Sequence, residues 1–212
     1  DTLSTLHDRP WTSVRMAKTA RKQGMRDVAL LLLNQATDER AINISDAFLK
    51  LREQILTYYN LDSKLERHGG LNLINLSNLS FFDASQKSEL FRLKALFLQS
   101  LQGRSKANQA FCHSVQICPT HGRAWCSWGD LCASLAAVTE KQVDQSASTG
   151  DGSEAAKDTA KKVRQYLAQA MGCYLEAVRI DGHEWARIHI PKCLWMLSKD
   201  GSTPGILCQT FE

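Results

Sequence analysis

The sequence is poor in proline and has no long apolar run. Only four prolines occur in 212 residues, at positions 10, 119, 191 and 204. Because proline breaks the interior of a helix, long stretches of the chain are free to be helical. The longest wholly apolar run is 28–33, and a helix that spans a bilayer needs about 20 apolar residues. We therefore expect no transmembrane helix.

No charge of one sign dominates, and no disulfide framework is visible. With 26 basic and 22 acidic residues, the net charge of +4 is too balanced to predict nucleic-acid binding. The seven cysteines are odd in number and lack paired spacing, so we expect reduced thiols in a cytosolic or nuclear protein. The chain starts at Asp1 with no charged-then-apolar leader, and we expect it to come from inside a longer polypeptide.

Helix signals follow one another, whereas strand signals hardly occur. The clearest is the capping-box pattern of Asp83 and Gln86 ahead of apolar residues at helical spacing. A first helix is capped by Asp8, has Pro10 in its opening turn and runs towards Gly24. The other expected helices are 25–36, 45–59, a weaker one at 62–78 interrupted by Gly69 and Gly70, 83–101, 104–117, 122–138, 154–180 and 184–198.

One segment, 139–159, looks different. It is rich in Gly and Ser and has no bulky apolar residue after Val143, a composition typical of a flexible insertion loop. The predicted organisation is therefore helical repeats over 1–138, the loop over 139–159, and continued repeats over 160–212.

A repeat of 34 residues decides the fold class. The step from Phe91 to Trp125 is 34 residues, and the same step relates Ala95 to Gly129. Small and aromatic residues in this order are typical of tetratricopeptide repeats. The sequence thus predicts an all-α solenoid of tetratricopeptide-like helical hairpins. The expected repeat-core residues are Phe91, Leu98, Ala107, Phe111, Trp125, Trp128, Gly129, Ala170, Tyr174 and Ala177, and we also expect Trp11 and Trp195 to be buried.

Catalytic and metal-binding patterns fail on spacing. His183 and His189 are six residues apart, whereas a pair of metal ligands on one helix face is four apart. The cluster of Cys and His between 112 and 132 has no close cysteine pair of the kind that zinc sites use. The glycine-rich stretch 150–155 has no strand before it, and no kinase motif occurs. We expect no catalytic, cofactor-binding or metal-binding residue in this chain.

A basic stripe is the one charged feature that suggests a partner. It comprises Arg15, Lys18, Arg21, Lys22 and Arg26, on and just beyond the first expected helix. Such a stripe is usually a solvated helix face. The sharper interpretation is a face for an anionic partner, either an acidic activator segment or a polyphosphate.

Six segments of the chain follow one another in a fixed order and spacing. They are DAFLKLREQ (46–54), NLINLSNLSFF (72–82), SELFRLKALFL (88–98), ANQAF (107–111), RAWCSWGD (123–130) and CLWMLS (193–198). Together these segments resemble the FAT region of phosphatidylinositol 3-kinase-related proteins. Within that group they are most similar to the TRRAP-like branch of transcription-associated pseudokinases, and the likeness runs from about Trp11 to Ser198.

This resemblance implies a non-catalytic scaffold in the nucleus. The expected partners are transcription activators, protein subunits of a histone acetyltransferase co-activator complex, and a kinase-like domain elsewhere in the parent protein, with neither membrane nor direct nucleic-acid binding. Several related FAT regions hold an inositol phosphate, which makes that ligand a possibility for the basic stripe. Two alternatives stay open: the FAT region of an active serine/threonine kinase of the same superfamily, and a free-standing tetratricopeptide adaptor.

Overall fold

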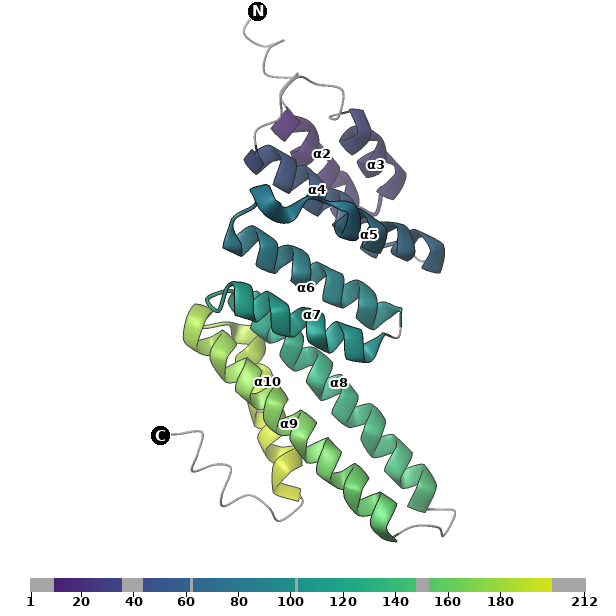
Figure 1. Ribbon diagram of the computed structural model, residues 1–212, viewed down its shortest axis with the longest axis vertical. Coiled ribbons are helices and arrows are strands. Elements are labelled where there is room, and N and C mark those ends of the chain that lie inside the picture. Colours follow the sequence, from purple (N-terminus) through teal and green to yellow (C-terminus); the bar gives the residue numbers. More distant parts are fainter. Residues whose placement is uncertain (1–9, 36–43, 62, 102, 148–152, 200–212) are drawn as a thin grey trace, which may run out of the picture. The chain divides into compact units, whose positions relative to one another are not determined.

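The computed structural model describes residues 10–35, 44–61, 63–101, 103–147 and 153–199. These residues form α-helices joined by short connections, with one 3-10 turn and no strand among them (Figure 1). The prediction of an all-α helical-repeat fold is confirmed. Within the described ranges, no helix combines the length and hydrophobicity that crossing a membrane requires.

The chain forms two compact units, Asp1–Ala110 and Phe111–Glu212, and this division differs from the predicted boundaries at 138 and 160. In the first unit, α2 packs on α3 and α4, and α4 packs on α5 and α6. The elements of this unit are α2 (Pro10–Lys22), α3 (Arg26–Gln35), α4 (Ile44–Tyr59), α5 (Lys64–Leu76), the 3-10 turn η1 (Leu79–Phe81) and α6 (Ala84–Ser100).

Local sequence signals explain where several of these helices begin and end. Gly24 takes a φ of 82° between α2 and α3, a backbone conformation that glycine adopts without strain. At the start of α6, the Asp83 carboxylate accepts from the Gln86 N–H at 2.8 Å, and the Gln86 side chain accepts from the Asp83 N–H at 3.2 Å. The predicted capping box is confirmed. Asp8, the expected cap of the first helix, lies outside the described residues.

The expected interruption of α5 at Gly69 and Gly70 is wrong, since α5 is continuous through both. Gly70 serves close packing instead. A Cβ atom there would lie 2.6 Å from Cζ of Phe97 and 2.8 Å from Cβ of Tyr58, so only glycine lets α5 approach α4 and α6 this closely.

The second unit is built on a long helical hairpin. It comprises α8 (Gly122–Ala147), α9 (Ser153–Asp181) and α10 (Glu184–Lys199), while α7 (Arg104–Ile117) is divided between the two units. Helices α8 and α9 lie side by side along their length, and α10 packs mainly on α9 (Figure 1).

The predicted loop at 139–159 is wrong for most of its length. Residues up to Ala147 continue α8, and residues from Ser153 onward belong to α9; 148–152 lie outside the described residues. Ala, Lys, Glu and Gln are strong helix formers even without bulky apolar neighbours. The segment therefore lengthens the hairpin.

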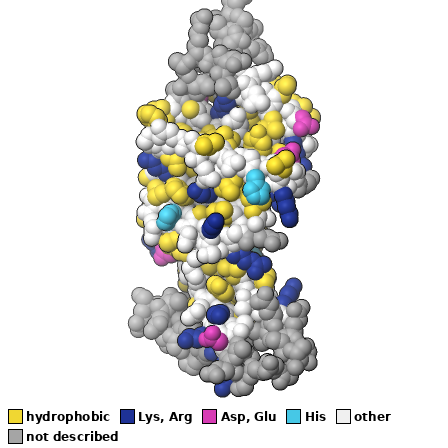
Figure 2. All heavy atoms as spheres, turned by 45° about the vertical axis from the view of Figure 1, so that its right-hand side comes forward, with side chains coloured by type: hydrophobic (Ala, Val, Ile, Leu, Met, Phe, Trp, Pro, Cys, Tyr) yellow, Lys and Arg dark blue, Asp and Glu magenta, His cyan; other side chains and the backbone are white. Residues whose placement is uncertain are grey.

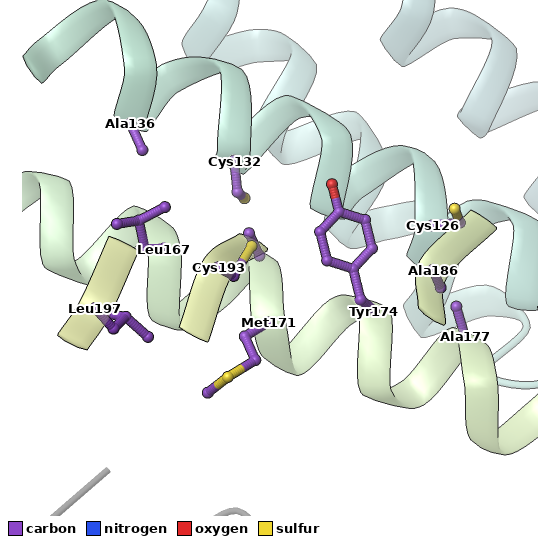
Figure 3. Packing of buried hydrophobic residues seen from close by; sticks show 11 residues of the cluster. Cys126, Cys132, Ala136, Leu167, Met171, Tyr174, Ala177, Ala186, Cys193 and Leu197 are labelled. Atoms are coloured by element: carbon purple, nitrogen blue, oxygen red, sulfur yellow. The ribbon is translucent and has the colours of Figure 1, made fainter. Parts of the chain in front are cut away.

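Each unit has its own apolar core. In the first unit, Ile55, Ile74, Leu90, Leu93 and Phe97 form one buried cluster, and Val14, Ala17, Ala20, Ala29 and Leu33 form another between α2 and α3. In the second unit, α8, α9 and α10 all contribute to one cluster (Figure 3). Burial of each large apolar side chain contributes roughly 1.5–3 kcal/mol.

Candidate functional site

The predicted repeat-core positions differ in how deeply they are buried. Ala107, Phe111, Ala170, Tyr174 and Ala177 are 0% exposed, and Gly129 is also buried. The four half-buried positions are Phe91, Leu98, Trp125 and Trp128. Trp125 and Trp128 stack on each other with ring centroids 5.7 Å apart, and the Trp125 indole N–H donates to the Pro119 carbonyl at 2.8 Å.

Tyr174 is the largest fully buried side chain, and its ring lies where α9 faces α8 (Figure 3). A Cβ atom on Gly129 would lie 2.6 Å from the Tyr174 ring, so the ring occupies the space that the glycine leaves. The Tyr174 hydroxyl donates to Asp130 Oδ1 at 2.9 Å. Burial, together with the Asp130 charge and this hydrogen bond, raises the pKa of Tyr174 well above its usual range, so the ring stays a neutral donor.

Two tryptophans expected in the core are less buried than predicted. Trp195 is 58% exposed on α10, and Trp11 is half-buried. Hydrophobicity alone does not say which face of a helix carries a residue, and Trp195 lies on the face of α10 that points away from the cluster formed by Cys193 and Leu197.

The basic stripe does not act as one surface. Arg15, Lys18 and Lys22 are exposed on α2, and helical geometry places them within about 60° of one another around its axis. Arg21 turns towards α4, where its guanidinium lies 2.9 Å from Glu53 Oε2. Arg26 lies on α3 and is partly buried. On the face drawn in Figure 2, Lys and Arg side chains are interspersed among hydrophobic ones.

Arg21 belongs to a chain of ion pairs that the sequence analysis missed. Arg52 bridges Glu53 at 3.1 Å and Glu89 at 3.1 Å, and Arg92 pairs with Glu89 at 2.7 Å. Three arginines and two glutamates thus connect α2, α4 and α6. Glu53 is the most deeply buried member, at 4% side-chain exposure, and Glu89 and Arg92 follow at 9% each. Only the pair Glu89 and Arg92, three residues apart on one helix, was readable from sequence.

The described part of the chain contains no cluster of reactive side chains. Its six cysteines are free, and burial raises the pKa of Cys126 and of Cys132 to about 12, so these thiols are protonated and poor nucleophiles. Within the same ranges, no group of three or more His, Cys, Asp or Glu is placed to hold a metal ion.

The fold defines the chain as an all-α helical-repeat protein. The FAT domain model matches residues 4–195, and the chain belongs to the FAT domain family. That family was expected from the six sequence segments, and it is confirmed.

The relatives that the chain matches are transcription-associated proteins. The chain is 31% identical over 206 residues to the SAGA complex/NuA4 acetyltransferase complex subunit TRA1 of Saccharomyces cerevisiae, covering 97% of this chain. It is 32% identical over 209 residues to the corresponding Tra1 subunit of Schizosaccharomyces pombe. Over 190 residues it is 31% identical to the transformation/transcription domain-associated protein of Homo sapiens, covering 88% of this chain. The chain spans 4–5% of the length of these three relatives.

Proposed function

We propose that this chain is a non-catalytic scaffold segment of a TRRAP-like nuclear pseudokinase, which docks transcription activators and subunits of a histone acetyltransferase complex. The observation that carries the proposal is the match of nearly the whole chain, at about 30% identity, to subunits named for the SAGA and NuA4 acetyltransferase complexes. An all-α repeat whose helices stack on one another and leave their outer faces exposed suits a docking role.

The experiment is affinity purification of the full-length parent protein from nuclear extract, with mass spectrometry and a kinase assay on the same sample. We expect acetyltransferase subunits in the sample and no phosphorylation of added substrate. Phosphorylation in the absence of those subunits would replace this proposal with its alternative, the FAT region of an active serine/threonine kinase of the same superfamily. Such a result would leave the fold and the family unchanged.

We also propose that the exposed face of α2 formed by Arg15, Lys18 and Lys22 contacts an acidic activator segment. Three cations on one helix face attract anions through a field that salt screens. The variant Lys18→Gln/Lys22→Gln of the full-length protein is expected to bind an acidic activator peptide several-fold more weakly. The control Lys161→Gln/Lys162→Gln, which removes two exposed lysines from α9, is expected to bind normally.

The same two variants separate a peptide from a polyphosphate. If inositol hexakisphosphate, tested in place of the peptide, loses affinity with the α2 variant while the acidic peptide does not, the face binds a polyphosphate and the activator assignment is wrong. If both α2 and α9 variants lose affinity equally, the effect is one of net charge, and α2 has no specific role.

A further inference from the structure

A groove runs between α8 and α10 in the second unit, with α9 as its floor. Its walls are Asp130, Ser134 and Ala137 on α8 and Lys192 and Met196 on α10, around a cavity of about 210 Å³. At 1.5 Å per residue, the α8 wall spans about 10 Å from Asp130 to Ala137, and the α10 wall spans about 6 Å from Lys192 to Met196. The residues of α8 are short, which lets another chain approach the helix backbone closely.

One end of this groove holds the carboxylate of Asp130, which forms no ion pair with a described residue. Asp130 Oδ1 accepts from the Tyr174 hydroxyl at 2.9 Å and from the Trp185 indole N–H at 3.3 Å. Among the described residues, no Lys or Arg forms an ion pair with Asp130. Two hydrogen bonds fix the position of this carboxylate, and its negative charge remains available to a cation that enters the groove.

A second polar group of the groove, the imidazole of His189, has a nitrogen without a hydrogen-bond partner among the described residues. The ring of His189 stacks on that of Tyr174 at a centroid distance of 5.4 Å and contacts the tilted ring of Trp185 at 4.5 Å. Its Nε2 atom is buried and has no hydrogen-bond partner in the part of the chain that the structure describes. Buried polar atoms are normally hydrogen-bonded, so this nitrogen is a polar group of the groove that the described residues leave unsatisfied.

The part of the groove away from Asp130 is apolar. Leu167 on α9 and Cys193 on α10 are 4% and 3% exposed and line it, together with Ala137 and Met196. An occupant therefore needs an apolar side chain beside Ala137 and Met196 and a positive charge beside Asp130. Lys192 is exposed. Solvent therefore screens its positive charge more strongly than it screens the negative charge of the partly buried Asp130.

From these contacts we propose that the groove between α8 and α10 binds a peptide segment of another subunit that carries a Lys or Arg beside an apolar residue. The basic side chain pairs with Asp130, and the apolar one lies between Ala137 and Met196. This inference rests on the proposed scaffold function and names the chemistry of one of its partners.

The test uses the full-length protein purified in its complex. The photo-crosslinker is introduced as Ser134→p-benzoylphenylalanine, because Ser134 lies exposed on the groove wall. Irradiation and mass spectrometry then identify the crosslinked segment. The same experiment is repeated with Asp130→Asn, whose amide oxygen still accepts from Tyr174 and Trp185 but whose charge is gone. The matched control is Asp158→Asn, which removes the same charge from an exposed site on α9.

We expect an adduct with a Lys- or Arg-containing segment of another subunit, about tenfold less adduct with Asp130→Asn, and no change with Asp158→Asn. Hydrogen exchange of α8 and α9 should be the same in both variants, which excludes misfolding as the cause. The proposal is overturned by an adduct within the protein's own chain, by a segment without a basic residue, by an unchanged yield with Asp130→Asn, or by no adduct. If acetyltransferase subunits co-purify in that sample and the groove still crosslinks to nothing, the groove assignment fails and the scaffold function stands.

Discussion

The close approach of α8 and α9 at Gly129 gives a sharp test of the fold. In Gly129→Ala, the new Cβ would lie 2.6 Å from Cε1 and 2.8 Å from Cδ1 of Tyr174. The ring has little room to move, since it is 0% exposed and its hydroxyl is bonded to Asp130. Overpacking costs about 1–3 kcal/mol, and weakening a hydrogen bond to a carboxylate costs about 1.5–3 kcal/mol.

Against these costs stands the higher helix propensity of alanine, worth about 1 kcal/mol. We therefore expect Gly129→Ala to destabilise the α8–α9 hairpin by about 2 kcal/mol. Gly172→Ala is the matched control, because Gly172 lies inside α9 with nothing within 4 Å of the added Cβ. It should stabilise the hairpin by up to about 1 kcal/mol.

Hydrogen exchange of the α8 and α9 amides in the full-length protein measures the change in hairpin stability in both variants. A loss of 2 kcal/mol corresponds to exchange about 30-fold faster, whereas Gly172→Ala should slow exchange a few-fold. If Gly129→Ala also slows exchange, the two helices do not approach as the structure has them, and the reasoning from Tyr174 is refuted.

Three further predictions concern ion pairs, a cap and thiols. Glu53→Gln leaves Arg21 and Arg52 without their shared carboxylate and should lower the stability of the first unit by about 3 kcal/mol. The loss should appear as faster hydrogen exchange in α4, and an unchanged exchange rate would contradict the prediction. Asp83→Ala removes the α6 cap and should cost about 1 kcal/mol, confined to the first turn of α6. Burial raises the pKa of Cys126 from 9.0 to about 12. The thiol therefore ionises at a lower pH in the unfolded chain than in the folded one, and the second unit should lose stability as pH rises from 9 to 12. A stability that stays constant over this pH range would contradict the burial of Cys126.

The helices were predictable because their signals are local. The capping box of Asp83 and Gln86 and the glycine at position 24 act within a few residues. The 34-residue step from Ala95 to Gly129 also carries a physical meaning, since small residues recur where helices cross closely. Such information is contained in the order of the residues and needs no knowledge of the tertiary fold.

Two predictions were wrong because they relied on residue type alone. Segment 139–159 lacks bulky apolar residues, yet its parts extend α8 and α9, because Ala, Lys, Glu and Gln favour a helix by their small entropy cost. Trp195 was expected in the core because it is large and apolar, yet it is 58% exposed. Which face of a helix is covered depends on the packing of other elements, and no local pattern specifies it.

The ion-pair chain shows most clearly what sequence could not supply. Arg21 and Glu53 are 32 residues apart, and no pattern within either helix predicts that they pair. The structure therefore reduces the number of basic residues in the stripe that can bind an anion. Arg21 is held by a carboxylate that is 4% exposed, so it is not available to an anion without breaking that pair. A partner on α2 meets three cations rather than five, and the salt dependence of its binding should be correspondingly shallower.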